Sequence, residues 1–166
     1  MEKIFLIGRR RTGTGSVVKG LNLLKYKKAN ILTSLTKNSI TELILKMNNK
    51  EICAVPFDFT INDIRAIEQA YPSCRFIHTE RNVDEWYSSF LRYYNKDSDK
   101  SSYKNKGYYV NDFYTKYNLT VRSHFLGREW KILYIKYGYN SSWGTLCSFV
   151  KKAVPNVSFP HENKLS

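Results

Sequence analysis

Residues 8–16 have the types and the spacing of a loop that binds phosphate. The segment reads Gly-Arg-Arg-Arg-Thr-Gly-Thr-Gly-Ser and follows a short apolar run at 3–7. Glycines allow a tight turn whose backbone N–H groups meet at one anion, and the positive end of a following helix strengthens the attraction. The alternative is a glycine-rich turn with surface arginines. We expect the phosphate ligands to be Arg10, Arg11, Thr12, Gly13, Thr14, Gly15 and Ser16.

The type of phosphate chemistry depends on the cation that the loop carries. Gly8 and Gly13 have the spacing of the Walker pattern G-x-x-x-x-G-K-[ST], but Thr14 stands at the position of its lysine. A nucleotide hydrolase would therefore lack its usual charge on the transferred phosphate. The loop offers Arg11 instead, and we expect this catalytic residue to stabilise negative charge on a leaving group.

A second basic position follows a later apolar run. Arg81 lies two residues after a strand-like segment at 75–79, and Ser89 lies eight residues further on. The end of a strand and two helical turns can bring an arginine and a serine together around one phosphate. Taken alone, Arg81 is as well explained as a surface charge and Ser89 as a solvated helix residue. Beside the first loop, the pair predicts a second phosphate site.

The segments that position these residues alternate along the chain. Short apolar runs predict strands at 3–7, 30–33, 52–55, 75–79 and 131–136. Apolar residues at helical spacing predict helices at 16–26, 39–47, 62–71, 83–94, 108–126 and 142–152. This alternation indicates an α/β fold, a three-layer sandwich with a central, mostly parallel sheet. Because the carboxyl ends of parallel strands share one edge, Arg11, Asp58 and Arg81 should converge there.

Length and composition bound the remaining possibilities. The 166 residues fit one domain, within which the polar stretch 95–106 reads as an exposed loop. The net charge of +13 favours anionic partners without choosing among them. No apolar run is long enough to span a membrane, and the three cysteines lack metal-ligand spacing. We therefore expect a cytoplasmic protein with reduced thiols; the sequence leaves its oligomeric state open.

The loop and the second basic site together resemble a known family. Gly-x-x-Arg-Thr-Gly-Thr-x-Ser after the first strand is similar to the 5′-phosphosulfate loop of P-loop sulfotransferases. Arg81 and Ser89 resemble the family's 3′-phosphate site. The segments 71–77 and 146–163 resemble, respectively, the family's lead-in to that site and the C-terminal tail of a bacterial-type branch. The loop departs from the usual pattern at Arg10 and Gly15, where the family generally carries proline and threonine.

The resemblance implies a P-loop NTPase-like sulfotransferase fold and a specific reaction. Family members move a sulfuryl group from 3′-phosphoadenosine 5′-phosphosulfate (PAPS) to a hydroxyl or amine and release adenosine 3′,5′-bisphosphate. It implies that the loop holds the 5′-phosphate, that Arg81 and Ser89 hold the 3′-phosphate, and that Lys164 adds a further contact. No metal is required in this scheme. The acceptor would be a small molecule or a carbohydrate, and the sequence does not say which.

Transfer to a hydroxyl or amine calls for a general base. Asp58 is our first choice because its neighbours Phe57 and Phe59 could raise the pKa of its carboxyl, and the same stretch matches a family segment with an Asp after this strand. His78 has a suitable intrinsic pKa, although a strand histidine is more often a core residue. Glu80 is better explained by pairing with a nearby arginine.

Three other functions stay open at the level of sequence. A P-loop nucleotide kinase or hydrolase is disfavoured by Thr14 and by the lack of a clear Walker-B aspartate. A non-catalytic basic protein that binds nucleotides or nucleic acid would explain the charge of +13 and the three consecutive arginines; we disfavour nucleic acid as the partner. A sulfotransferase that binds the nucleotide without transferring is the third.

Overall fold

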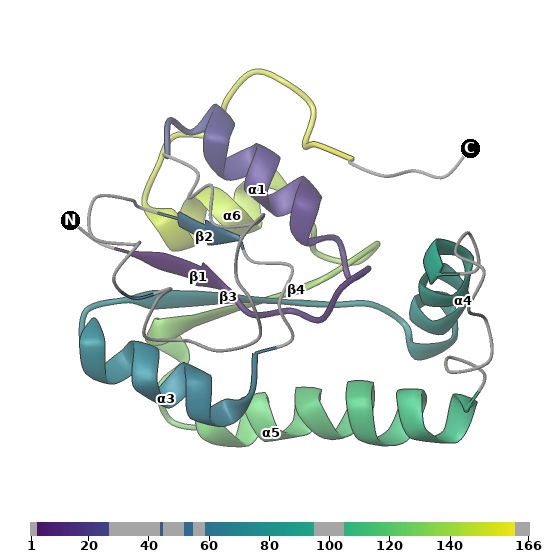
Figure 1. Cartoon of the computed structure of the whole chain (residues 1–166). Helices are drawn as coiled ribbons and strands as arrows, with labels where there is room; N and C mark the ends of the chain where they lie inside the picture. The colour runs from purple at the N-terminus through teal and green to yellow at the C-terminus, as the bar shows by residue number, and fades with distance from the viewer. Residues whose placement is uncertain (1–2, 27–43, 45–51, 55–58, 95–104, 162–166) are drawn as a thin grey trace.

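A four-stranded parallel sheet forms the centre of the molecule. The computed structural model describes residues 3–26, 44, 52–54, 59–94 and 105–161 (Figure 1). In order along the chain, the strands are β1 (Ile4–Leu6), β2 (Ile52–Ala54), β3 (Arg75–Glu80) and β4 (Ile132–Lys136). The order across the sheet is β2-β1-β3-β4, and each neighbouring pair is parallel. The predicted parallel sheet is therefore confirmed, with β1 and β3 side by side at its centre.

Helices cover both faces of this sheet, which confirms the predicted three-layer sandwich. Figure 1 shows α1 (Thr14–Leu23) and α6 (Trp143–Val150) on one face and α3 (Ile61–Ala70) and α5 (Lys116–His124) on the other. The remaining long elements are α4 (Val83–Tyr94), beyond the end of β3, and the π-helix η2 (Tyr108–Thr115). A single turn of 3₁₀-helix, η3 (Glu129–Lys131), leads into β4.

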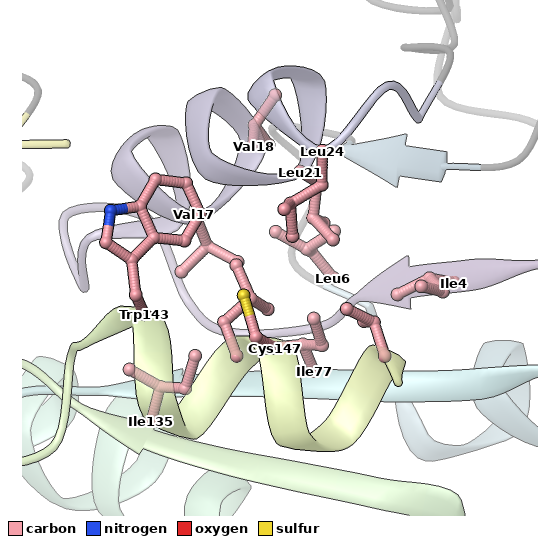
Figure 2. Packing of buried hydrophobic residues seen from close by; sticks show 12 residues of the cluster. Ile4, Leu6, Val17, Val18, Leu21, Leu24, Ile77, Ile135, Trp143 and Cys147 are labelled. Carbon is pink, nitrogen blue, oxygen red and sulfur yellow. The ribbon is translucent and has the colours of Figure 1, made fainter. Parts of the chain in front are cut away.

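Alternation along the strands divides the core in two. Ile4 and Leu6 of β1 pack toward α1 and α6, whereas Phe5 packs toward α3 and α5. Figure 2 shows the first of these clusters, in which side chains of α1 and α6 meet over β1 and β3. The same alternation in β3 sends Ile77 to the first cluster and Phe76 to the second. Alternate residues of one strand therefore pack into the hydrophobic clusters on opposite faces of the sheet.

Local signals explain where the helices begin and end. Gly13 begins α1 from a left-handed conformation, with φ of 96°. Thr60 and Asp63 form a reciprocal capping box at the start of α3, which stabilises its first turn. That helix ends at Ala70 with Tyr71 as its C-cap, directly before Pro72, where the sequence predicts the end.

The structure differs from the sequence-based expectation in one helical span. The predicted helix 108–126 is divided into η2 and α5, and the N–H of Lys116 donates to the carbonyl of Asn111, five residues earlier. Apolar periodicity indicates a helical span but does not distinguish this hydrogen-bond pattern from the α-helical one. The strand predicted at 30–33, the helix at 39–47 except residue 44, and the loop at 95–106 except its last two residues lie outside the described residues.

A half-buried ionic cluster joins α3 to α5 and η3 at the end of the sheet away from the carboxyl edge. Glu68 contacts His124 Nε2 at 2.6 Å, Arg128 Nη1 at 2.8 Å and Lys131 Nζ at 3.1 Å. Burial opposes ionisation of Glu68, but the hydrogen bonds and charges of these three partners outweigh it and hold the pKa of the carboxyl below its ordinary value of 4.5. The cluster therefore stabilises the packing of three elements.

Candidate nucleotide-phosphate site

The glycine-rich loop lies directly against the end of β3. A Cβ atom on Gly8 would lie 2.6 Å from the carbonyl oxygen of Thr79 and 2.8 Å from its nitrogen, so only glycine fits. The hydroxyl of Thr79 contacts Thr12 Oγ1 at 2.6 Å and Thr14 Oγ1 at 3.0 Å. The loop is thus attached to β3 on both sides of Gly13.

The backbone of the loop has the shape of an anion cradle. Arg11 and Gly13 adopt left-handed conformations, with φ of 68° and 96°. The structure records no acceptor for the backbone N–H groups of residues 12–15 among the residues that it describes. Helix geometry leaves the first amides of α1 without an intrahelical partner, so they can bind an anion. The amide of Ser16 is different, since it already donates to the carbonyl of Gly13 at 3.1 Å.

Two of the three consecutive arginines fasten the loop to its surroundings. Arg9 donates from Nε to the carbonyl of Phe113 at 3.0 Å, and its guanidinium lies 3.7 Å from the centre of the Tyr117 ring. Arg10 Nη1 donates to the hydroxyl of Tyr94 at 2.7 Å, while its carbonyl accepts from the indole of Trp86 at 2.9 Å. These contacts hold the loop against α4, η2 and α5.

Arg11 connects the two phosphate sites that the sequence predicts. Its Nε lies 3.3 Å from Ser89 Oγ, and its guanidinium lies 5.0 Å from the centre of the Tyr93 ring. Ser89 is buried in α4, whereas Arg11 is half-buried. Two residues that are 78 positions apart in the chain therefore meet at the carboxyl edge of the sheet.

Arg81 lies at the same edge, immediately after β3. Its Nε contacts Glu85 Oε2 at 3.1 Å, an exposed pair between neighbouring turns. Its backbone N–H donates to the hydroxyl of Tyr114 at 2.7 Å, which fixes the chain where β3 leads into α4. Because α4 also carries Ser89, this turn determines how the arginine and the serine face the loop.

Tyr137 is a site residue that sequence reasoning missed. It follows β4, and the Arg81 guanidinium lies 4.9 Å from the centre of its ring. A Cβ atom on Gly13 would lie 3.0 Å from Tyr137 Cδ2, so the ring also borders the loop. His161 approaches the same ring edge-on at 6.3 Å. The available signal was its place directly after the strand predicted at 131–136, which puts it at the carboxyl edge.

The candidate base His78 lies on the other face of the sheet. Its side chain is fully buried between Tyr117 and Tyr134, with ring centres 5.8 Å away in each case. Its Nε2 is 3.2 Å from Glu80 Oε1, but the direction is wrong for a hydrogen bond, and neither ring nitrogen has one with a described residue. The structure does not bring His78 to the loop. Of the consecutive residues His78, Thr79 and Glu80, it is Thr79 whose side chain contacts the loop.

Glu80 pairs with an arginine, as the sequence suggests. Its Oε2 accepts from Arg122 Nη2 of α5 at 2.7 Å. Burial raises the pKa of Glu80, but the contacts with His78 and Arg122 outweigh this and hold it below 4.5. The two other predicted site residues, Asp58 and Lys164, lie outside the described residues.

Comparison with solved structures shows the same fold. The structure of mouse sulfotransferase SULT7A1 complexed with PAP superposes with a TM-score of 0.66 at 16% identity, over 93% of this chain and 60% of that one. A sulfotransferase from Alicyclobacillus acidocaldarius gives a TM-score of 0.65 at 14% identity, over 95% of this chain and 84% of that one. The chain thus spans less than two thirds of the mouse structure. None of the described helices is long and apolar enough to cross a membrane.

Comparison of the sequence with models of protein families identifies the family of this chain. A search of curated proteins found no significant match. The model of the family described as "Sulfotransferase domain" matches residues 3–105 and 92–166, which together cover nearly the whole sequence. The predicted resemblance to sulfotransferases is therefore confirmed, and the chain belongs to the sulfotransferase domain family.

Proposed function

We propose that this chain transfers a sulfuryl group from PAPS to a hydroxyl or amine of a small-molecule or carbohydrate acceptor. The observation that supports this function best is the contact between Arg11 and Ser89, which joins the glycine-rich loop to the second basic site. A nucleotide with phosphates at both the 5′ and the 3′ position needs two such sites at one edge of a sheet. The mouse sulfotransferase that shares this fold is itself complexed with PAP, which is consistent with a nucleotide as the ligand.

The chain's residues suit both phosphates. The amides of residues 12–15 would hold the 5′-phosphate, with the N-terminal end of α1 behind them. Arg81 and Ser89 would hold the 3′-phosphate. The pair between Arg81 and Glu85 is exposed on one side and contributes only a few tenths of a kcal/mol, so a phosphate can replace it readily.

The catalytic roles follow from where charge develops on the reacting atoms during sulfuryl transfer. When bound, PAPS supplies a sulfuryl group whose bond to a phosphate oxygen breaks as the acceptor oxygen or nitrogen attacks. Arg11 would stabilise the charge on the departing phosphate, because it is half-buried and directly precedes the amides of residues 12–15 in the loop. Asp58 would take the acceptor's proton. Burial of His78 on the α5 face argues against a role for that residue as base.

The proposal covers three further properties. Lys164 would extend the phosphate contacts from the C-terminal tail. The reaction would need no metal, and the chain would work as a single cytoplasmic domain. The second candidate function is that of a kinase that transfers phosphate. Thr14 counts against it, because Thr14 stands at the position of the Walker lysine and the transferred phosphate would lack the positive charge of that lysine.

Calorimetric titration with three nucleotides tests the proposal. We expect adenosine 3′,5′-bisphosphate to bind more tightly than AMP, and ATP with magnesium to bind no better than AMP. Arg81→Ala should weaken the bisphosphate by about 10- to 100-fold, because a charge-assisted hydrogen bond contributes about 1.5–3 kcal/mol. Arg92→Ala is the matched control, since it removes the same charge from an exposed position of α4.

Two results would contradict the proposal. Equal affinity for the bisphosphate and AMP would show that the chain has no second phosphate site. Tight magnesium-dependent binding of ATP would indicate that the chain is a phosphotransferase. Turnover with PAPS and a panel of acceptors then tests the base. Asp58→Asn should lose turnover and keep its affinity for the bisphosphate; retained turnover would exclude Asp58.

A further inference from the structure

We propose that Thr79 is a positioning residue that sets the spacing between the glycine-rich loop and the Arg81–Ser89 site, and so gives the chain its preference for a nucleotide that carries both a 5′- and a 3′-phosphate. This inference rests on the proposed function and extends it to a residue that touches neither phosphate. Thr79 lies at the centre of the sheet, in β3, two positions before Arg81. Its side chain is fully buried.

A chain of hydroxyl groups runs through Thr79. Thr12 Oγ1 donates to the carbonyl of Arg9 at 2.5 Å, which uses its single proton. Thr12 must then accept from Thr79 at 2.6 Å, and Thr79, with its own proton used, must accept from Thr14 at 3.0 Å. Thr14 therefore donates to Thr79, Thr79 donates to Thr12, and Thr12 donates to the carbonyl of Arg9. Removing the middle hydroxyl breaks two of these three hydrogen bonds.

These two bonds flank the point where the loop turns. Thr12 and Thr14 stand on either side of Gly13, so the Thr79 hydroxyl fixes both ends of the turn to one strand. The same strand continues into Arg81, whose backbone is held by Tyr114. The distance from the loop amides to Arg81 is therefore determined through Thr79.

Burial makes this attachment effective. Water does not compete for the Thr79 hydroxyl, and hydrogen bonds in such surroundings are stronger than at the surface. The close approach of Gly8 to the backbone of Thr79 leaves the loop no room to settle nearer to β3. Without the hydroxyl, the loop is expected to shift along or away from the strand. Such a shift changes the fit of a bisphosphate, whose two phosphates must reach both sites at once, more than the fit of a monophosphate, which occupies the loop alone.

The test compares Thr79→Val, which keeps the shape and removes the hydroxyl, with Thr79→Ser, which keeps the hydroxyl. The quantity measured is the ratio of the dissociation constants of AMP and adenosine 3′,5′-bisphosphate. Thr79→Val should lower this ratio at least fivefold, about the effect of one net hydrogen bond of 1 kcal/mol, and Thr79→Ser should retain it. Thr120→Val is the control, because among the described residues the Thr120 hydroxyl bonds within α5 alone, to the carbonyl of Lys116 at 2.8 Å.

Each outcome decides the question. If Thr79→Val folds and keeps the wild-type ratio, the inference is wrong while the proposed function stands. If the wild-type chain does not distinguish the two nucleotides, the proposed function fails and the inference fails with it. A merely structural Thr79 would lower the melting temperature without changing the ratio. If the valine variant does not fold, Thr79→Cys carries the same test, because a thiol is only a weak donor and acceptor.

Discussion

Replacing Gly8 with alanine should disrupt the centre of the molecule through a single methyl group. Gly8 does not have a positive φ, so its backbone conformation suits alanine as well. The constraint is space: the added Cβ would lie 2.6 and 2.8 Å from backbone atoms of Thr79 in the neighbouring strand. Backbone at the centre of a sheet cannot move aside as a flexible side chain can, so β1 and β3 must separate at this point.

The expected cost can be bounded from known overpacking effects. Inserting a methylene into a packed core costs about 1–3 kcal/mol, and a clash with backbone belongs at or above the upper end. Separation of the strands also weakens the adjacent bond from the N–H of Ile7 to the carbonyl of Ile77, which is 2.9 Å long. A loss of about 3 kcal/mol lowers the melting temperature of a chain of this size by about 6–12 °C.

Thermal unfolding followed by circular dichroism measures this directly. Gly144→Ala is the matched control, because its added Cβ would meet nothing closer than Ser142 Oγ at 3.9 Å. Gly144 lies inside α6, where alanine is favoured over glycine by up to about 1 kcal/mol, so this variant should melt at or above the wild-type temperature. A Gly8→Ala protein that melts within about 2 °C of wild type would refute the steric argument.

Two further predictions concern groups away from the loop. Because the folded pKa of Glu68 is below 4.5, its cluster stabilises the protein above that pH and loses this contribution as the pH falls through the folded pKa. Urea unfolding at a series of pH values from about 6 to about 3 should therefore show a steeper loss of stability for wild type than for Glu68→Gln. At neutral pH, Glu68→Gln should itself lower the free energy of unfolding by about 2 kcal/mol, because it weakens hydrogen bonds to a charged group. Equal slopes for the two proteins would contradict the assignment. Burial raises the pKa of the Cys74 thiol to about 12, so iodoacetamide at about pH 8 should leave Cys74 unmodified in the folded protein and alkylate it in urea, as read by mass spectrometry. Rapid alkylation of Cys74 without denaturant would show that the thiol is more accessible than the structure indicates.

Local sequence patterns predicted the main parts of the site. The run of apolar residues, the glycines and the following helix lie within about 20 positions, so the phosphate loop is encoded by neighbours in the chain. Arg81 and Ser89 are likewise joined by a single turn and helix. Parallel pairing of β1 with β3 then brings the two segments to one edge, and that pairing follows from alternating strands and helices.

Contacts between distant segments could not be predicted. The role of Arg10 depends on a tyrosine 84 positions away, and that of Thr79 on threonines 65 and 67 positions away. No short motif records such partners, because they are set by how the layers pack. His78 illustrates an intermediate case: the period of two places it on the same face as Phe76, but the sequence does not say that this face is covered by α5.

The indole of Trp86 gives the molecule an optical reporter of its own. Trp86 is fully buried, stacks on Tyr114 with ring centres 4.1 Å apart, and donates its N–H to the carbonyl of Arg10 in the loop. Trp130, by contrast, is 68% exposed and its emission should be open to a soluble quencher such as acrylamide. With that emission quenched, the remaining fluorescence comes from two buried indoles: Trp143 of α6, and Trp86, which is bonded to the loop itself. A displacement of the loop by an anion should then appear as a change in emission wavelength, without any attached dye.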